Sequence, residues 1–423
     1  MISFEQILAN KLPFIRRNCE QFHKRISHLC GCLEYPTRHS QSLMILRKTL
    51  PMEAQQNIRF NTKQRQFFKV LHERVDNYFK MESKSRFGNW TIWVKTAFMF
   101  ALYLVPFFLM LFGVLAGNWW VLLGFFIMGL GMAGIGLGVM HDANHGSISR
   151  NQWINNLLSY SLNFVGGHNK NWQMQHNHLH HTYTNIDGHD EDIAPLGFLR
   201  FSPHAPLKKI HRFQFLYAWF FYGLMTFMWV TTKDFNQLVR YNKMGLLKQR
   251  GLNFKKELAL IIISKVFYYA YVIALPVLFF KCSWWIIPIG FMIKQFTSGI
   301  ILAAIFQPAH VVEATDFPKP NETGHMETDW SIHQLYTTAN FAPKNWLLSW
   351  YVGGLNYQVE HHLFPAISHV HYKHLSPIVE QTAKEFDLPY YSEKYFIGAL
   401  WSHQKMLWRL GREENPSLAP ALA

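Results

Sequence analysis

The chain has 423 residues, of which 49% are hydrophobic and only 16% are charged, and its formal net charge is +15. A composition this apolar and charge-poor is unusual for a soluble protein, and the positive excess favours anionic partners such as lipid headgroups or a phosphate-bearing substrate. A nucleic-acid partner is disfavoured, because the basic residues flank apolar segments and form no separate basic domain.

The first segment, residues 1–52, is polar, basic and weakly patterned, and we expect it to be an N-terminal extension of the main domain. It lacks the basic–apolar–cleavage pattern of a signal peptide, so the later apolar segments must direct membrane insertion. Apolar residues from Phe67 to Phe79 then recur at helical spacing among basic ones. This pattern predicts an amphipathic helix, which either lies on a membrane surface or packs on the rest of the domain.

Two long apolar runs follow at about 92–115 and 119–140, joined by a tight turn at Gly117-Asn118. Each run is long enough to cross the hydrocarbon core of a bilayer as a helix. The run Gly134-Ile135-Gly136-Leu137-Gly138 has the look of a nucleotide-binding loop, but it lies inside a spanning helix and follows no strand. Its glycines therefore predict close packing between helices.

A second hairpin is predicted from the apolar runs at about 258–280 and 284–306. The moderately apolar segment 213–231 is placed in the membrane interface, because a further crossing would separate the histidine clusters that lie on either side of it in the chain. Nearly all Lys and Arg residues lie opposite the two short outer turns, and the positive-inside rule makes that side cytoplasmic, together with both termini.

Lys294 lies near the middle of the last predicted span, where a lysine costs at least ~2.5 kcal/mol unless it faces the bundle or water. We expect it either to line a substrate cavity or to reach the interface with its charged end. After this span, residues 366–410 predict two cytosolic helices around Leu388-Pro389 that form a cap. The main domain is expected to cover 53–410, followed by a C-terminal tail at 411–423.

Three histidine clusters stand beside the apolar segments, and their members fall on one helix face by spacing. They are His141 and His145; His176, His180 and His181; and Gln358, His361 and His362. Imidazole suits iron, copper, nickel and zinc. Isolated histidines are usually satisfied core or surface residues, but three clusters at ligand spacing predict a metal site.

The four cysteines, Cys19, Cys30, Cys32 and Cys282, match no zinc, iron–sulfur or disulfide pattern. No strand–glycine-rich loop–helix pattern for a nicotinamide or flavin is present either. A redox reaction in this protein would therefore need an electron source outside the chain.

The histidine motifs resemble those of the membrane fatty acid desaturases. They read His141-Asp142-Ala143-Asn144-His145, His176-Asn177-His178-Leu179-His180-His181 and Gln358-Val359-Glu360-His361-His362. A glutamine at the start of the third motif is similar to the front-end branch, the linoleoyl-CoA desaturase-like proteins. The resemblance covers about residues 55–410. The His-Pro-Gly-Gly mark of a fused b-type cytochrome domain, which many front-end relatives carry, is absent.

The resemblance implies two iron ions and an all-α membrane fold, with four transmembrane helices in two hairpins, interfacial helices and a cytosolic helical cap. The implied ligands are His141, His145, His176, His180, His181, His310, His361 and His362. Gln358, which replaces a histidine of other branches, would bind iron weakly, act through a water molecule or orient a neighbouring ligand. His178 lies off the shared face and is left out. Most of His325, His333, His369, His371 and His374 are expected to be structural or to support the ligands.

The implied activity is dioxygen-dependent insertion of a cis double bond into a long-chain acyl group carried by coenzyme A or a phospholipid. An unactivated methylene has no acidic proton and no leaving group, so acid–base side chains alone cannot remove its hydrogens. The electron donor would be a ferredoxin or a b-type cytochrome with its reductase. The lack of a fused cytochrome domain favours a bacterial inner membrane over the endoplasmic reticulum as the location. The acidic turn Asp187–Asp192 is expected to be a solvated loop, or else to contact a cytosolic partner.

Two alternatives to desaturation remain from the sequence. The same scaffold resembles membrane hydroxylases, which would add oxygen to the acyl chain. A histidine-rich metal transporter belongs to another class, but its ligands would lie at mid-membrane depth along a polar path. Here the clusters lie at the ends of the spans and in the segments between them, which disfavours transport.

Overall fold

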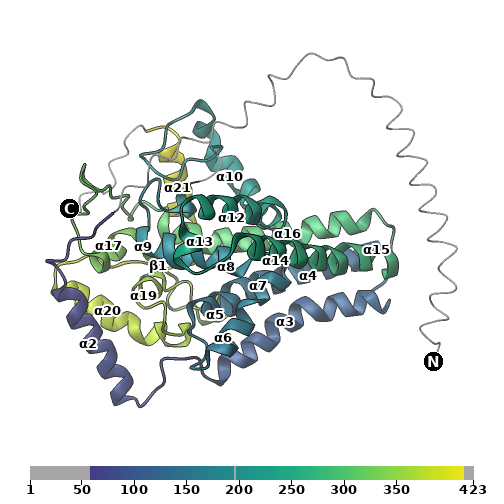
Figure 1. Ribbon diagram of the computed structural model, residues 1–423, viewed down its shortest axis with the longest axis horizontal. Coiled ribbons are helices and arrows are strands. Elements are labelled where there is room, and N and C mark those ends of the chain that lie inside the picture. Colours follow the sequence, from purple (N-terminus) through teal and green to yellow (C-terminus); the bar gives the residue numbers. More distant parts are fainter. Residues whose placement is uncertain (1–57, 195–196, 414–423) are drawn as a thin grey trace. The chain divides into compact units, whose positions relative to one another are not determined.

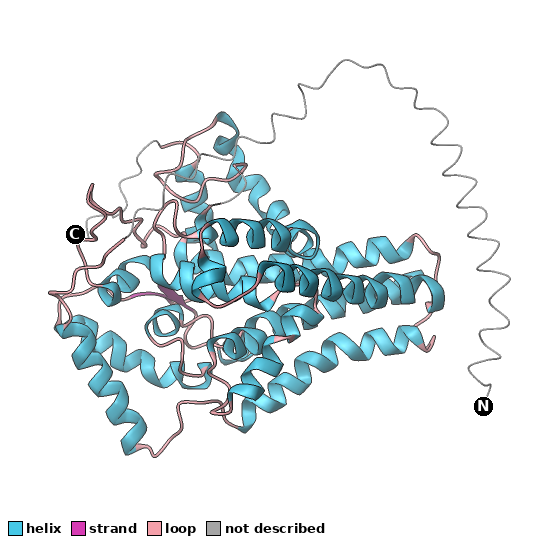
Figure 2. Cartoon of the chain, viewed as in Figure 1, coloured by secondary structure: helices cyan, strands magenta, loops and turns pink. Residues whose placement is uncertain are grey.

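A computed structural model describes residues 58–194 and 197–413. Within them the chain is mostly helical, and one pair of short strands lies among the helices (Figure 2). The strands β1 (Ala339–Phe341) and β2 (Tyr391–Glu393) are parallel, with Asn340 opposite Ser392. The predicted extension 1–52 and most of the predicted tail lie outside the described residues.

Four helical segments are long and apolar enough to cross a membrane: 90–111, 118–145, 254–279 and 286–310. They comprise α3 (Trp90–Leu111); α4 (Asn118–Gly134) with its continuation; α14 (Phe254–Tyr269) with η7 (Ala270–Ala274) and α15 (Leu275–Phe279); and α16 (Ile286–His310). The long helices run side by side (Figure 1). The four predicted spans and their two hairpins are therefore confirmed, with ends shifted by a few residues.

The two outer turns of these hairpins lie against each other. The Gly117 backbone N–H donates to the Lys281 carbonyl at 2.7 Å, and the Ser283 N–H donates to Asn118 Oδ1 at 3.0 Å. These bonds join the two hairpins at the end of the bundle that carries no histidine cluster.

Glycines allow α4 to pack closely between α3 and α16, as the sequence predicts. A Cβ atom on Gly131 would lie 2.6 Å from the backbone nitrogen of Tyr103 on α3. A Cβ on Gly290 of α16 would lie 2.1 Å from the Phe125 ring on α4. Because no side chain fits at these distances, the glycines set how closely the spans approach.

The second span does not stay α-helical to its end. After α4 it becomes a π-helix, η2 (Ile135–Met140), and then continues as α5 (His141–His145). The second histidine motif follows the same order, with α8 (Asn169–Trp172), the π-helix η3 (Gln173–His180) and α9 (His181–Tyr183). Rare π-helical turns occur often at functional sites. Of the four π-helical segments among the described residues, η2 leads into the first histidine cluster and η3 carries His176 and His180 of the second.

A helical cap covers the ends of the spans that carry the histidines. It includes α17 (Trp330–Thr337), α18 (Trp346–Tyr351), α19 (Gln358–Leu363), η8 (His369–His371), α20 (Tyr372–Glu385) and α21 (Phe396–Leu410). The predicted amphipathic helix is α2 (Gln66–Met81), and its buried residues, such as Leu71 and Val75, pack with Leu375 and Val379 of α20. Of the two roles considered for this helix, packing on the domain is the one observed.

The segment between the second motif and α14 is a chain of short helices. They are η4 (Glu191–Ile193), η5 (Lys209–Phe213), α10 (Gln214–Gly223), α11 (Met225–Met228), η6 (Trp229–Lys233), α12 (Asp234–Lys243) and α13 (Leu246–Gln249); α6 (Gln152–Ser159) and α7 (Ser161–Phe164) precede the motif. The pair Lys209–Gly223 and Met225–Lys243 bends by 52°. Together these two helices are apolar enough for a broken span or a re-entrant loop, so the place of 213–231 in the membrane interface stays a prediction.

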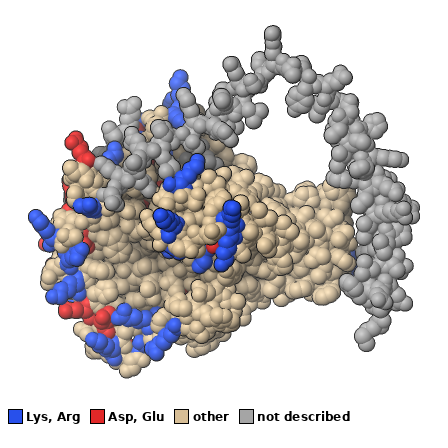
Figure 3. Space-filling model, in the orientation of Figure 1, with Lys and Arg blue, Asp and Glu red and all other residues tan. Residues whose placement is uncertain are grey.

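Charged side chains gather at the capped end of the bundle. On the face drawn in Figure 3, Lys, Arg, Asp and Glu lie over the cap and the short helices, whereas the long helices show almost none. Many large apolar side chains on the spans are exposed, including Val105, Ile263 and Val266. An exposed apolar surface of this kind belongs in lipid, which agrees with a membrane protein.

Candidate metal centre

The second histidine motif is placed by a wide helical turn. In η3 the backbone follows the π-helical pattern, in which each hydrogen bond spans five residues. His176, His180 and His181 are separated by four and five residues, so a turn of this width brings all three rings to one side. His176 Nε2 and His181 Nε2 lie 3.2 Å apart.

The eight predicted histidines come together from five elements: α5, η3, α9, α16 and α19. Their candidate ligand atoms lie within 4.8 Å of one another in overlapping groups. The groups are His141, His145, His176 and His361; His180, His310 and His362; His181, His361 and His362; and His176, His180 and Asp192. His310 joins the second group from the end of α16, although it belongs to no motif. The first two groups share no residue, and His181 lies between them because it is grouped with His361 of the first and His362 of the second.

The donor atoms fit metal ions better than they fit one another. The Nε2 atoms of His145, His310, His361 and His362 are buried and have no hydrogen-bond partner. His141 Nε2 lies 3.1 Å from His176 Nε2, close to the ~3 Å between two nitrogens that bind one ion at about 2.0–2.1 Å. Buried polar atoms are rarely left unpaired. The convergence of unpaired nitrogens therefore indicates that this cluster can hold metal.

The outward-facing nitrogens of four of these histidines are held by groups around the cluster. His180 Nδ1 lies 3.1 Å from both oxygens of Asp190, and His362 Nδ1 donates to Gln334 Oε1 at 2.8 Å. His361 Nδ1 donates to the Tyr372 hydroxyl and His310 Nδ1 to the Thr337 carbonyl, each at 3.2 Å. Such partners fix the ring orientation and leave the other nitrogen, Nε2, free for a metal.

Burial and mutual repulsion keep most of these rings neutral. Burial first, and then neighbouring imidazoles, hold the pKa of His176, His181, His361 and His362 well below the usual histidine value. His180 differs: burial lowers its pKa, but Asp190 and Asp192 outweigh burial and raise it to about 9. A neutral imidazole offers a lone pair, which is the form that binds metal.

Three further residues singled out in the sequence, Gln358, His178 and Lys294, lie outside the eight converging histidines. Gln358 is buried at the start of α19 and donates its Nε2 to the Leu355 carbonyl at 2.9 Å; it also interacts with His310. His178 is half-buried and belongs to none of the groups. Lys294 is fully buried, and its Nζ donates to the Tyr268 hydroxyl at 2.8 Å. The roles of Gln358 as a ligand and of Lys294 in substrate binding stay predictions.

The acidic turn after the second motif was predicted to be solvated, and for Asp190 this is wrong. Asp190 is 1% exposed, because it folds back on His180 and accepts hydrogen bonds from the Asn185 and Asp192 backbone at 2.9 Å. Gln334 and Tyr372 were also missed. Their partners are 28 and 11 residues away in sequence, and no local spacing signals either contact.

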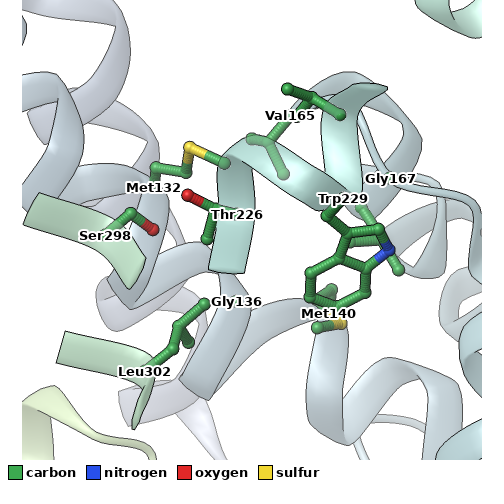
Figure 4. Close-up of a pocket in the computed structure, with 11 residues that line it drawn as sticks. Met132, Gly136, Met140, Val165, Gly167, Thr226, Trp229, Ser298 and Leu302 are labelled. Atoms are coloured by element: carbon green, nitrogen blue, oxygen red, sulfur yellow. The ribbon is translucent and has the colours of Figure 1, made fainter. Parts of the chain in front are cut away.

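A small cavity of about 20 Å³ lies inside the bundle, next to the first cluster (Figure 4). Its wall includes Met140, which directly precedes His141. The lining residues are Met132, Gly136, Met140, Leu162, Val165, Gly167, Thr226, Trp229, Val230, Ser298 and Leu302. The Ser298 hydroxyl is buried without a partner. Two of the wall residues are methionines, whose flexible side chains adapt readily to what they pack against.

The known proteins that resemble this chain are fatty acid desaturases. The profile of the fatty acid desaturase family matches residues 117–394. The chain is 34% identical to the sn-1 linoleoyl-lipid 6-desaturase of Arthrospira platensis, over 81% of this chain and 92% of that protein. It is 36% identical to the Synechocystis enzyme of the same name, over 83% and 97% of the two chains. An acyl-lipid (8-3)-desaturase of Physcomitrium patens is 32% identical, over 82% and 72%.

Proposed function

From the finding that this chain belongs to the fatty acid desaturase family, we propose that it is a two-iron enzyme that introduces a cis double bond into the acyl chain of a membrane lipid. The family makes the protein a desaturase and an oxidoreductase. The observation that carries the two-iron assignment is the convergence of eight histidines, four of which have a buried Nε2 atom without a hydrogen-bond partner, beside an apolar cavity.

The two ions would be held by the two main groups of histidines. His141, His145, His176 and His361 would hold one, and His180, His310 and His362 the other, with His181 between them. When bound, the irons would supply the activation of dioxygen that acid–base side chains cannot provide. The surrounding residues orient the imidazoles and exclude bulk water, and burial keeps most of the rings neutral until a metal binds. His180, which Asp190 holds in the protonated form, would release a proton on binding the metal.

The overall reaction determines how many electrons and protons must be supplied. Two neighbouring methylene groups, dioxygen, two electrons and two protons give one double bond and two water molecules. The acyl chain is oxidised by loss of two hydrogens, and dioxygen is reduced. No electron-carrying cofactor site is evident in the sequence, so the two electrons come from a separate carrier protein.

A glycerolipid is the substrate that the relatives favour. The cyanobacterial relatives are named for linoleoyl-lipid and the moss relative for acyl-lipid. A lipid-bound chain would enter from the bilayer and place its tail among the spans, where the cavity of about 20 Å³ bordered by Met140 and Leu302 would widen to admit it. The depth reached there would decide which carbons lie at the histidines, by positioning alone. The new double bond would lie between an existing double bond and the carboxyl group, which is front-end desaturation. The relatives named as 6-desaturases support this position.

The histidine end of the bundle is proposed to be cytoplasmic, in a bacterial inner membrane, with both termini on the same side. The outer turns, 112–117 and 280–285, contain a single basic residue, Lys281. This asymmetry supports the orientation through the positive-inside rule. A reporter enzyme that is active only in the cytoplasm should be active when it is fused to the C-terminus. A reporter that is active only in the periplasm should be inactive in the same position.

The electron carrier is proposed to be acidic, as a ferredoxin or a b-type cytochrome would be. Between Asp234 and Glu257 the chain has six basic residues, all exposed, and no acidic one: Arg240, Lys243, Lys248, Arg250, Lys255 and Lys256. Figure 3 shows basic side chains on this face, which carries α12 to α14. Leu246 and Leu247 pack beneath them against Met174 and Leu179 of the second motif. Complementary charge would steer a carrier to the outside of that motif.

The carrier can be tested separately from the chemistry. Reversing two charges, K248E with R250E, should slow turnover with an acidic carrier but leave turnover with a small uncharged reductant unchanged. The matched control reverses Lys63 and Lys69, which are exposed just before and within α2, outside the segment from Asp234 to Glu257, and should have no effect. Equal loss with both reductants would contradict this docking surface.

The activity itself is tested by lipid analysis of a host that expresses the chain and is fed linoleate. Mass spectrometry should find acyl chains that have lost two hydrogens, with the new double bond nearer the carboxyl group. A gain of one oxygen would instead identify a hydroxylase. Unchanged lipids, with folded and iron-loaded protein and a working carrier, would refute the proposal.

A further inference from the structure

A lysine is buried where the first span meets the metal centre. Lys95 lies in the second turn of α3 and is 3% exposed. Its Nζ lies 2.5 Å from His369 Nε2, and the Trp350 ring lies 5.8 Å away. A buried ammonium is costly unless it is paired and hydrogen-bonded, so the contact with His369 needs a structural or functional reason.

The contact continues to the metal centre. His369 Nδ1 lies 2.7 Å from Asp142 Oδ2, and the same oxygen accepts from the His369 backbone and the Ser368 hydroxyl, each at 3.3 Å. Asp142 Oδ1 lies 3.6 Å from His141 Nδ1, an electrostatic contact that is longer than a hydrogen bond and leaves this buried nitrogen with no other partner. The opposite nitrogen of that ring, His141 Nε2, faces His176 inside the centre. Three contacts therefore connect a membrane lysine to one of the proposed ligands.

The chemistry of these groups determines which atom donates and which accepts in each contact between Lys95 and His141. An ammonium can only donate hydrogen bonds, so His369 Nε2 must accept and the ring proton must sit on Nδ1. His369 Nδ1 then donates to Asp142, which holds this carboxylate with its other oxygen toward His141 Nδ1. A proton on His141 Nδ1 leaves the lone pair of Nε2 for a metal.

The packing around Lys95 keeps this arrangement in place. A Cβ on Gly138 would lie 3.3 Å from Lys95 Cδ, and a Cβ on Gly353 would lie 2.6 Å from Gly138 Cα. Gly353 also has a φ of +65°, which favours glycine. The helix that leads into the first motif and the loop before the third thus touch through glycines, and the lysine stem runs beside that contact.

We propose that Lys95 is a positioning residue for one of the two metal ions. Through His369 and Asp142 it fixes the ring of His141, so that Nε2 binds the ion held with His145, His176 and His361. The inference rests on the proposed function, because it needs a metal at this group. The other group has its own carboxylate, Asp190, on His180, so the effect is confined to one ion.

The test is a cobalt(II) titration of the purified, metal-stripped protein in detergent, followed by visible absorption. The wild-type chain should bind two ions. K95M keeps the length of the side chain but removes the donor, and should bind one ion as tightly as wild type and the other about 10–100-fold more weakly. K95R, which still donates, should recover most of that loss.

A matched control and a double-mutant cycle separate positioning from general damage. Lys265 is also buried in a span, paired with Asp234 at 2.8 Å, and K265M should leave both cobalt affinities unchanged. In H369N the amide can donate to Asp142 without help from a lysine, so adding K95M should cost little further affinity.

Equal loss from K95M in the wild-type and H369N backgrounds would overturn the inference, as would wild-type affinity at both sites in K95M or an equal loss in K265M. A wild-type protein that binds no cobalt would instead overturn the proposed metal site, and this inference with it.

Discussion

Replacing Asp190 by asparagine tests how far the second group of histidines depends on the turn that follows the second motif. Both Asp190 oxygens lie 3.1 Å from His180 Nδ1, and they accept the backbone N–H groups of Asp192 and Asn185, each at 2.9 Å. An asparagine side chain has one acceptor oxygen and one NH₂ donor. The D190N side chain must therefore turn a donor toward one of these three N–H groups.

The loss of one hydrogen bond to a charged group costs about 1.5–3 kcal/mol, which is roughly 10–150-fold in an equilibrium constant. We expect cobalt(II) affinity at His180, His310 and His362 to fall by this factor, while affinity at the His141 group stays unchanged. D187N, in the same turn, is the control. If D190N binds both ions like wild type and keeps its activity, the idea that Asp190 orients His180 is refuted.

H361A should leave folded protein that makes no desaturated lipid, measured by gas chromatography of host lipids; normal product levels would remove His361 from the site. G136L should fill the cavity and shift products toward shorter acyl chains, because a Cβ there meets only Leu302 at 3.4 Å; an unchanged chain-length profile would place the substrate elsewhere. Stripping metal with a chelator should lower the Tm, since an ion at 100 times its Kd adds about 2.7 kcal/mol; equal Tm values would argue against bound metal. R200M should lower the Tm strongly, because the buried guanidinium donates to the carbonyls of Ala205 and Leu410 at 2.7 and 2.6 Å and each such bond contributes about 1.5–3 kcal/mol; a wild-type Tm would contradict this.

The four spans are predictable because their signal is local. A run of apolar residues such as 119–140 has the length of a bilayer core, and lipid-facing helices need no long-range partner to be recognised. The histidine clusters are visible for the same reason, since their members are separated by three to five residues. His310 lacks such spacing, and the resemblance to a family, not the local pattern, marks it as a candidate.

What could not be predicted depends on contacts between distant segments or on backbone detail. Apolar periodicity cannot tell a π-helical turn from an α-helical one, so the width of η3 was not foreseen. Asp190 carries the same sequence signal as Asp187, which is only partly buried, and Asp190 is buried because the chain turns back toward His180. Lys95 and His369 are 274 residues apart, and no local sequence pattern around either residue predicts their contact.

The central claim is that two irons lie among these histidines, and iron anomalous diffraction from crystals of the iron-loaded protein tests it most directly. The account predicts two peaks, one among His141, His145, His176 and His361 and the other among His180, His310 and His362. A single peak, or iron bound only outside these residues, would contradict it.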